Sequence, residues 1–189
     1  MIINYKYVKL EPSENKVKKN EYLHKESYKL LEKILYDNFI DKSVKIVYKY
    51  SEYGKPSLYN SDYKFNISYS EEMVCTAISK KEIGIDIELI RKYNESLIKF
   101  VLSKDEREEL NSVKNKEEYF FRLWTLKESY IKAIGKGLSC PMKNINFRII
   151  GEKILSNVDN YNFYQKIIEI EGRKYIISVA WGDEDELVL

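Results

Sequence analysis

The sequence predicts an α+β fold of two similar lobes that meet near residue 82. Segments in which apolar and polar residues alternate, as they do in half-buried strands, recur in both halves of the chain. Each half also contains a long stretch with apolar residues at helical spacing. The predicted order is strand, helix and three strands in the first half, then strand, helical segments and three strands in the second.

The first half opens with an alternating strand at residues 2–8. A helix is predicted from about residue 21 to residue 37, because Leu30, Leu31, Ile34 and Leu35 form an apolar stripe. Gly54 and Pro56 mark a loop. Further strands are predicted at 44–50, 64–69 and 73–79.

The second half opens with a strand at 83–89. Ser103 and Glu106 have the S-x-x-E spacing of a capping box, so a helix is expected to begin there, after a shorter helical stretch beyond Arg91. The main helix is predicted at about 116–134, with Gly135 ending it. Strands are predicted at 145–150, 162–170 and 174–181, and the acidic tail 183–186 is expected to be solvated.

Composition restricts the class of protein. The 189 residues include 32 Lys and Arg against 30 Asp and Glu, and this near-balance argues against a nucleic-acid binder. No stretch approaches the roughly 20 apolar residues that a membrane span needs, and the N-terminus lacks the layout of a signal peptide. Cys75 and Cys140 show no metal or redox spacing, so a reducing, cytoplasmic location is expected.

The single histidine, His24, limits the available chemistry. A zinc site with several histidines is excluded, and a Ser-His-Asp triad could draw only on His24. Any metal site is therefore expected to use oxygen ligands, which favour Mg²⁺, Mn²⁺ or Ca²⁺.

Two carboxylates share one face of the strand at 83–89. Asp86 and Glu88 are two residues apart, so both point to the same side, while isoleucines line the other. Gly84 on the carboxylate side leaves room for the close approach of a ligand. The alternative interpretation is an ordinary half-buried strand with its polar face in water.

The main helix carries a second charged pair. Glu128 and Lys132 are one turn apart on one face. Lys127 falls within the apolar stripe, where a charge is costly unless it is paired or bound to a metal. The alternative interpretation of Glu128 and Lys132 is a helix salt bridge worth a few tenths of a kcal/mol.

The glycines after this helix do not form a phosphate loop. Gly135-Lys136-Gly137-Leu138-Ser139 lacks the G-x-x-x-x-G-K-[ST] spacing and follows a helix instead of opening one. The C-terminal end of a helix carries the negative end of its dipole, so a cap and tight turn is the better interpretation.

Several segments match one family in its order along the chain. They are Tyr53-Gly54-Lys55-Pro56, Phe65-Asn66-Ile67-Ser68-Tyr69-Ser70, Gly84-Ile85-Asp86-Ile87-Glu88 and Trp124 through Leu138, with Leu23-His24-Lys25-Glu26 also similar. The pair formed by G-[IV]-D-[IV]-E and W-x-x-K-E-x-x-x-K is specific. On these residues the chain resembles the 4′-phosphopantetheinyl transferases of the Sfp type, and its length suits them better than the shorter trimeric holo-carrier-protein synthases.

The resemblance implies a reaction and an architecture. Coenzyme A would give its 4′-phosphopantetheine arm to a serine of an apo carrier protein from fatty-acid, polyketide or nonribosomal-peptide synthesis, releasing adenosine 3′,5′-bisphosphate. The implied monomer has two lobes related by a pseudo-twofold axis, each a small mainly antiparallel sheet packed with a long helix. Residues 1–82 would form the adenine and 3′-phosphate side, and residues 83–189 the Mg²⁺ and diphosphate side, in one compact unit.

The resemblance also implies which residues hold the metal and the phosphates. Asp86, Glu88 and Glu128 would bind Mg²⁺, or Mn²⁺ as an alternative, along with the diphosphate of coenzyme A. Mg²⁺ needs few protein carboxylates because it keeps waters and takes phosphate oxygens. Lys132 would contact the diphosphate and stabilise charge on the leaving group. Ser68 would lie at the phosphates.

Lys55 and Pro56 match the loop that lies beside the adenine and 3′-phosphate. The attacking serine comes from the carrier protein and must lose its proton. Glu128, or Glu106 acting through a water, is the candidate base. For Glu106 the alternative interpretation is that it caps the start of its own helix.

Tyr69 departs from the family pattern, which usually has a histidine there that contacts the 3′-phosphate. Tyrosine donates one hydrogen bond but is uncharged near neutral pH. We therefore expect weaker discrimination between coenzyme A and its 3′-dephospho form, although lysines at 16, 18 and 19 offer other cations.

Two other hypotheses stay open. The chain could be a coenzyme A-binding or carrier-binding relative without turnover, which the change at Tyr69 motivates and the intact set of Asp86, Glu88, Glu128 and Lys132 argues against. It could also be a different Mg²⁺-dependent phosphotransferase or a nuclease, which the missing phosphate loop and the balanced charge disfavour.

Overall fold

The computed structural model describes residues 1–10 and 15–183, apart from the side chain of Leu138. Two three-stranded antiparallel sheets form its centre, with strand orders β1–β5–β4 and β6–β10–β9. The strands are β1 (Ile2–Tyr7), β4 (Lys64–Ser70), β5 (Met73–Ser79), β6 (Ile83–Leu89), β9 (Tyr161–Ile170) and β10 (Arg173–Gly182). Beyond Asp183, the tail predicted to be solvated lies outside the described residues.

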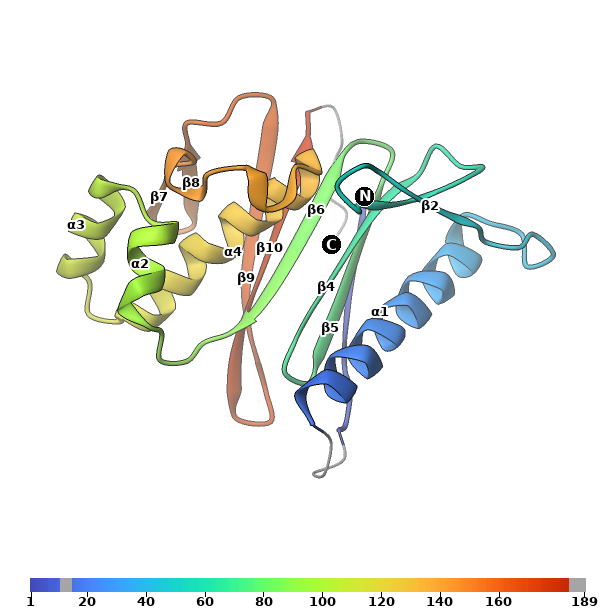
Figure 1. The fold of residues 1–189 in the computed structure, drawn as a ribbon, viewed down its shortest axis with the longest axis horizontal. Helices are drawn as coiled ribbons and strands as arrows, with labels where there is room; N and C mark the ends of the chain where they lie inside the picture. The colour runs from blue at the N-terminus through green and yellow to red at the C-terminus, as the bar shows by residue number, and fades with distance from the viewer. Residues whose placement is uncertain (11–14, 184–189) are drawn as a thin grey trace.

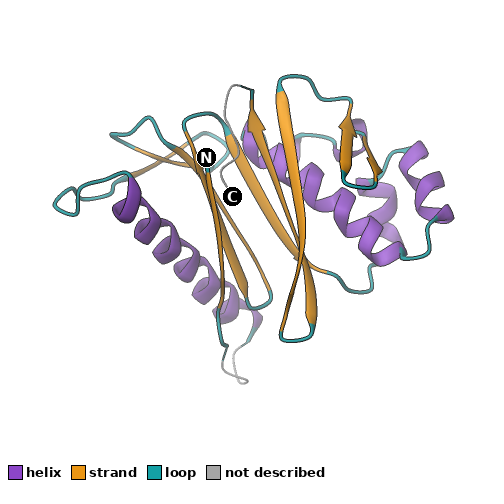
Figure 2. Ribbon diagram, turned by 180° about the vertical axis from the view of Figure 1, so that it is seen from behind, coloured by secondary structure: helices purple, strands orange, loops and turns teal. Residues whose placement is uncertain are grey.

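One long helix packs on each sheet. Helix α1 (Lys16–Asn38) covers the first sheet and helix α4 (Lys116–Ile134) covers the second, so the two sheets lie between them (Figures 1 and 2). No helix in the described part of the chain is long and apolar enough to cross a membrane.

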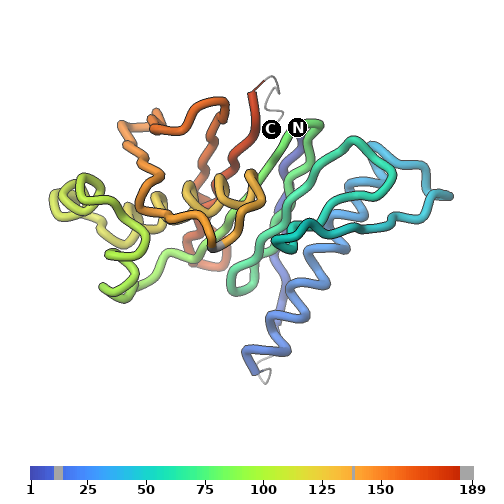
Figure 3. Tube along the Cα trace, turned by 45° about the horizontal axis from the view of Figure 1, so that its top comes forward, coloured from blue at the N-terminus to red at the C-terminus, as the bar shows by residue number. Residues whose placement is uncertain are grey.

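The two halves repeat the same order of elements. Each has a strand, a long helix, a two-stranded hairpin and two further strands, and in each sheet the last of these strands lies in the middle. The hairpins are β2 (Tyr48–Tyr50) with β3 (Pro56–Leu58), and β7 (Phe147–Ile150) with β8 (Lys153–Ser156). Only the second half inserts α2 (Glu95–Val101) and α3 (Lys104–Ser112) before its long helix. The two halves lie side by side (Figure 3), and the predicted α+β class with two similar lobes is confirmed.

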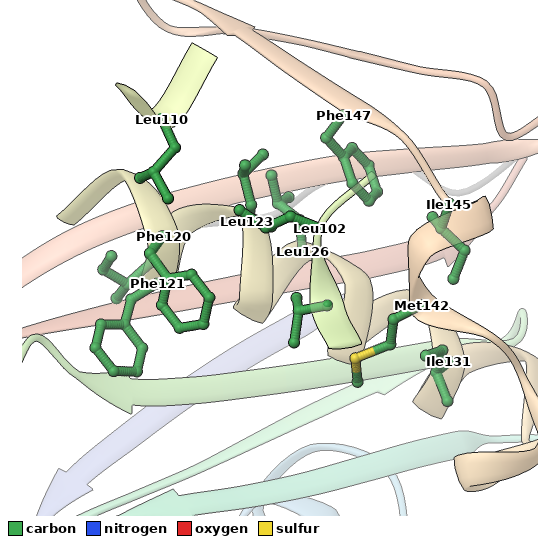
Figure 4. Close-up of a cluster of buried hydrophobic side chains, with 12 residues drawn as sticks. Leu102, Leu110, Phe120, Phe121, Leu123, Leu126, Ile131, Met142, Ile145 and Phe147 are labelled. Carbon is green, nitrogen blue, oxygen red and sulfur yellow. The ribbon is translucent and has the colours of Figure 1, made fainter. Parts of the chain in front are cut away.

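Three apolar clusters hold the layers together. One lies between α1 and the first sheet, one lies between the two sheets, and one surrounds α4 (Figure 4). Fully burying a side chain such as Leu31, which is 0% exposed, stabilises the fold by about 1.5–3 kcal/mol. Because β5 and β10 each face a helix on one side and the other sheet on the other, they are mostly apolar on both faces.

The capping predictions agree with the structure. Ser103 and Glu106 form a capping box, in which each side chain accepts a hydrogen bond from the other's backbone N–H. Helix α4 ends at Gly135, whose φ of 68° is left-handed and therefore suits glycine. Helix α1 begins five residues earlier than predicted, at Lys16, because Asn15 caps it through the N–H of Lys18.

The predicted strands agree with the structure less well in the two hairpins. The strand predicted at 44–50 is reduced to β2, β3 lies in the predicted loop, and β7 starts two residues later than predicted because a 3₁₀ turn (Met142–Asn144) precedes it. Strand β8 has no predicted counterpart. These hairpins are short and largely exposed, so the alternation that reveals a half-buried strand is weak.

Candidate active site

The edge strands β4 and β6 of the two sheets are joined through side chains. Asn66, Ser68 and Ser70 alternate along β4 and therefore point to one side. The Oδ1 atom of Asn66 accepts a hydrogen bond from the N–H of Ile85 at 2.9 Å, and the Oγ atom of Ser70 accepts one from the N–H of Leu89 at 3.2 Å. This connection places Ser68 against the carboxylates of β6.

Helix α4 lies directly against β6 because Gly84 has no side chain. A Cβ atom at Gly84 would lie 2.0 Å from the backbone oxygen of Ser129 and 2.4 Å from the backbone nitrogen of Ala133. The room at Gly84 is thus taken by α4 and not by a ligand, so that part of the prediction is wrong. The close approach brings Glu128 and Lys132 next to the carboxylates of β6.

A cavity of about 330 Å³ lies where β4, β6 and α4 meet. We call it the acidic pocket. Its lining residues are Ile67, Ser68, Tyr69, Asp86, Glu88, Trp124, Glu128 and Lys132. The structure therefore brings together the predicted site residues of the strand at 83–89, the main helix and the Ser68–Tyr69 segment.

Asp86 and Lys132 form the centre of the acidic pocket. The Nζ atom of Lys132 donates to Oδ1 of Asp86 at 2.6 Å, to Oγ of Ser68 at 2.9 Å and to the backbone oxygen of Ile85 at 3.3 Å. Burial alone lowers the pKa of Lys132, but Asp86 outweighs it and the net pKa is raised. Asp86 is 4% exposed, and its Oδ2 atom is buried without a hydrogen-bond partner. Such an atom is costly unless a donor or cation reaches it.

Glu88 and Glu128 add negative charge beside Asp86. Burial, and then the charge of Asp86, raises the pKa of Glu88 to about 7. The same two causes raise the pKa of Glu128. Oε2 of Glu88 accepts from Oγ of Ser70 at 3.1 Å and lies 3.7 Å from NH2 of Arg91. Like charges held together in a pocket are typical of functional sites.

The pocket only partly matches the predicted three-carboxylate metal site. Among the described residues, no three His, Cys, Asp or Glu side chains are placed to hold a metal ion. Lys132 occupies one oxygen of Asp86, and Glu88 turns toward Ser70 and Arg91. The partnerless Oδ2 of Asp86 nevertheless fits a hard cation, because Mg²⁺ binds through one or two carboxylates plus water and phosphate.

Glu106 lies apart from the acidic pocket. Its Oε2 atom accepts from Nζ of Lys127 at 2.5 Å and from the N–H of Ser103 at 2.9 Å, and its Oε1 atom accepts from the N–H of Phe147 at 2.9 Å. Lys127 is 0% exposed and also donates to the backbone oxygen of Val101 at 2.7 Å. The alternative interpretation of Glu106 as a capping residue is confirmed, and this geometry does not bring it to the site as a base.

Lys55 and Pro56 line a separate cavity of about 430 Å³ near the C-terminal end of α4. The Nζ atom of Lys55 donates to the backbone oxygen of Ala133 at 2.6 Å and to Oε2 of Glu82 at 2.8 Å. Lys55 therefore satisfies a carbonyl at the end of α4 and ties the first half of the chain to the second. Burial lowers the pKa of Lys55.

A third cavity, of about 710 Å³, opens beside the acidic pocket. We call it the basic pocket. Its lining residues are Lys16, Lys19, Asn20, Leu23, Tyr69, Ser70, Glu71, Glu88 and Arg91. Tyr69 and Glu88 line both pockets, so the two pockets are adjacent. The ring of His24 lies edge-on to that of Tyr69, with centroids 6.3 Å apart.

Some residues of the site carry a signal that the sequence prediction did not use. Asn66, Ser68 and Ser70 repeat at the period of a strand, which indicates a polar face on β4. Glu71 and Arg91 carry no such signal, since only the folded chain brings the turn after β4 next to the end of β6.

Comparisons with known proteins identify the family of this chain. A family model of the 4′-phosphopantetheinyl transferase superfamily matches residues 82–180. The chain is 37% identical over 155 residues to 4′-phosphopantetheinyl transferase Sfp of Bacillus subtilis, an alignment that covers 78% of this chain and 68% of Sfp. The chain therefore belongs to the 4′-phosphopantetheinyl transferase superfamily, as the resemblance predicts.

Two further relatives match over shorter stretches. The chain is 43% identical over 101 residues to 4′-phosphopantetheinyl transferase gsp of Aneurinibacillus migulanus, which covers 52% of this chain and 42% of that protein. It is 37% identical over 103 residues to 4′-phosphopantetheinyl transferase HetI of a Nostoc species, which covers 50% of this chain and 44% of that protein. The chain thus spans about two thirds of Sfp and less than half of these two relatives.

Proposed function

We propose that this protein transfers the 4′-phosphopantetheine arm of coenzyme A to a serine hydroxyl of an apo carrier protein. The serine oxygen would form a bond to the phosphorus that carries the pantetheine arm. The bond from that phosphorus to the bridging oxygen would break, so that adenosine 3′,5′-bisphosphate leaves. The observation that carries the proposal is Asp86, whose Oδ2 atom is buried without a partner while Lys132 holds Oδ1, in a chain of this superfamily.

In this proposal Lys132 and Ser68 bind the diphosphate of coenzyme A. Both already share one hydrogen-bond cluster with Asp86. The ammonium group of Lys132 would stabilise charge that develops on the leaving phosphate, where a fixed charge in a water-poor pocket is most effective. Tyr69, on the wall of the same pocket, would contact the donor with its ring and hydroxyl group.

Glu128 is the proposed base for the serine of the carrier. It is half-buried on the wall of the acidic pocket, and no hydrogen bond engages its carboxylate among the described residues. A carboxylate without a partner is free to accept a proton from an incoming hydroxyl group. Glu106, whose oxygens are fully engaged elsewhere, has no part in this proposal.

Mg²⁺, or Mn²⁺ in its place, is the proposed cofactor. Asp86 would hold it through Oδ2, with Glu128 and Glu88 as further oxygen ligands around the pocket. The bound cation would neutralise charge on the phosphate oxygens during transfer.

The proposal divides the work between the two halves of the chain. Residues 1–82 would form the adenine and 3′-phosphate side of the site, and residues 83–189 would hold the metal and most of the diphosphate. We further propose that the protein acts as a monomer in the cytoplasm. The joined edge strands β4 and β6 both come from one chain, and both cysteines are free thiols.

The test is transfer to an apo carrier protein. The protein, coenzyme A and Mg²⁺ are mixed with a panel of apo carrier proteins, and the carriers are weighed by intact-protein mass spectrometry. We expect the mass of one phosphopantetheine arm to be added, and we expect EDTA or Asp86→Ala to abolish the addition. Asp159→Ala removes an exposed carboxylate from a loop outside the pocket and should leave it intact.

Two outcomes would contradict the proposal. Binding of coenzyme A without any mass gain across the panel would indicate a binding protein without turnover. Cleavage or transfer of phosphate on other compounds, with the carriers unchanged, would indicate a different phosphotransferase.

A further inference from the structure

The basic pocket gathers three cationic side chains from distant parts of the sequence. Lys16 and Lys19 come from the first turn of α1, and Arg91 follows the end of β6. Tyr69 and Glu88 line both this pocket and the acidic pocket, so the two pockets lie next to each other. A ligand whose diphosphate lies at Lys132 can therefore extend a further anionic group toward these cations.

Glu71 already engages two of these cations. Its Oε2 atom lies 2.5 Å from Nζ of Lys19, and its Oε1 atom lies 3.3 Å from NH1 of Arg91. The hydrogen bond from Lys19 lowers the pKa of Glu71, which keeps its carboxylate charged at neutral pH. The side chains of Glu71 and Lys19 are 30% and 24% exposed, so the cluster is partly withdrawn from water.

The backbone of Glu71 is also strained. Its φ is 54°, in the left-handed region that costs a non-glycine residue roughly 1 kcal/mol. Glu171 has a φ of 50° in the corresponding turn between β9 and β10, but it is exposed and lies outside the basic pocket. The two turns therefore have similar backbones, and only the first places its carboxylate among cations.

We propose that Glu71 is a specificity-determining residue, whose carboxylate competes with a phosphate monoester of the donor for Lys19 and Arg91. This inference rests on the proposed function. Coenzyme A carries one phosphate monoester on its ribose, in addition to the diphosphate. Such a group bears a charge of about −1.5 to −2 at pH 7 and binds lysine and arginine strongly. Glu71 occupies the cations that this group would use, and it repels the group as well.

The test compares coenzyme A with 3′-dephospho-coenzyme A as donors. Dissociation constants are measured by calorimetry and kcat/KM by transfer to a carrier, for the wild-type protein and for Glu71→Gln. Glutamine keeps the size of the side chain and removes its charge. We expect the preference for coenzyme A over the dephospho form to rise about fivefold in both measurements. Lys19→Gln should lower the same preference.

Two glycine variants separate charge from backbone strain. Glu71→Gly removes the strain together with a charge inside the basic pocket, and Glu171→Gly removes the same strain together with an exposed charge outside that pocket. The proposal requires a rise in preference for Glu71→Gly and none for Glu171→Gly. Circular dichroism of each variant checks that the fold is kept.

Three results would overturn the inference. One is a donor preference that stays within twofold of wild type in Glu71→Gln. Another is an equal change for both donors together with a changed KM for the carrier, which would make the cluster a contact for acidic side chains of the carrier. The third is a rise of the same size in Glu171→Gly. If the wild-type protein transfers nothing, the proposed function fails, while calorimetry still reads the donor preference by itself.

Discussion

The two halves of this protein share one order of elements but differ in the chemistry of their first strands. The turns that join the last two strands are closed by the pairs Ser70–Met73 and Ile170–Arg173, which aligns β5 with β10. In that alignment Asp86 and Glu88 of β6 correspond to Ile2 and Asn4 of β1, the partners of Ile78 and Thr76. The repeated fold thus supplies the scaffold, and a few polar residues in one half supply the site.

The long helices differ in the same way. Charged residues of α1 pair at the surface, as Lys33 does with Asp37 at 2.9 Å. Helix α4 instead buries Lys127 completely and turns Glu128 and Lys132 toward the acidic pocket. The second half therefore buries both partners of an ion pair, whereas the buried Glu26 of α1 pairs with lysines that are half-exposed. Variants can measure what this difference contributes.

The largest expected effect is a loss of stability when the buried ion pair of the second half, Lys127 with Glu106, is broken. Lys127→Met removes the ammonium group and leaves the carboxylate of Glu106 buried without its counter-ion. We expect the free energy of unfolding in urea to fall by about 3–5 kcal/mol. The same substitution in α1, Lys33→Met, removes an exposed pair and should change it by less than about 0.5 kcal/mol.

A second variant keeps that prediction testable. Lys127→Met combined with Glu106→Gln removes both charges and should recover part of the loss, because no isolated charge stays buried. If Lys127→Met alone costs no more than Lys33→Met, the buried pair contributes nothing special and the contrast between the helices fails.

The next effect concerns the contact between α4 and β6. Gly84→Ala places a methyl group where the backbone of Ser129 and Ala133 already lies, so α4 must move. We expect a loss of about 1–3 kcal/mol in unfolding free energy. We also expect a fall in transfer rate of roughly 100-fold, because the movement displaces Glu128 and Lys132.

Gly182→Ala is the matched control for this variant. A Cβ atom there would lie 3.8 Å from that of Lys81, which is an ordinary contact. Its stability should stay within about 0.5 kcal/mol of wild type. Equal behaviour of the two variants would show that the backbone adjusts freely and that Gly84 does not position the site.

The sequence predicts some of the contacts that these variants probe and leaves others unpredicted. Periodicity predicts the strands and helices whose faces are buried, and spacing within one element predicts that Asp86 lies beside Glu88 and Glu128 beside Lys132. Contacts between elements lie beyond local spacing, so the pairing of Lys127 with Glu106 and the packing of α4 on Gly84 appear only in the folded chain. Each hairpin is predicted only in its first strand, within 44–50 and 145–150. The second strands, β3 and β8, are missed because they are short and β8 is largely exposed, which removes the burial pattern that marks a strand.

A smaller effect is expected from the pH dependence of stability in the second half. The pKa of Glu88 is raised from 4.5 to about 7 by burial and by Asp86, so the folded state binds a proton that the unfolded state releases. Its stabilising contribution is present below pH 4.5 and is lost as the pH rises through 7. Without added Mg²⁺, unfolding free energy should fall by about 1–2 kcal/mol across that window.

Glu88→Gln is the variant that isolates this effect. It cannot ionise, so the unfolding free energy should fall less steeply between these pH values. A slope equal to that of the wild-type protein would show that other groups cause the pH dependence and that Glu88 titrates normally.

The smallest effect, with the opposite sign, is expected in the first half. Glu26 is 5% exposed and accepts from Nζ of Lys29 at 2.6 Å and from Nζ of Lys6 at 3.0 Å. The hydrogen bond from Lys29 is the main cause that lowers the pKa of Glu26 below 4.5. Its stabilising contribution is therefore present above pH 4.5 and is lost as the pH falls through the depressed value.

Glu26→Gln should accordingly cost up to about 1 kcal/mol at pH 7 and progressively less in acid, because the two lysines are half-exposed and water screens the pair. Urea unfolding of Glu26→Gln and Glu88→Gln over one pH series measures both slopes directly. If unfolding free energy changes with pH in opposite directions at the two sites, the charge of Glu26 stabilises the first half, whereas the charge of Glu88 destabilises the second. Slopes of the same sign would remove that distinction between the two halves.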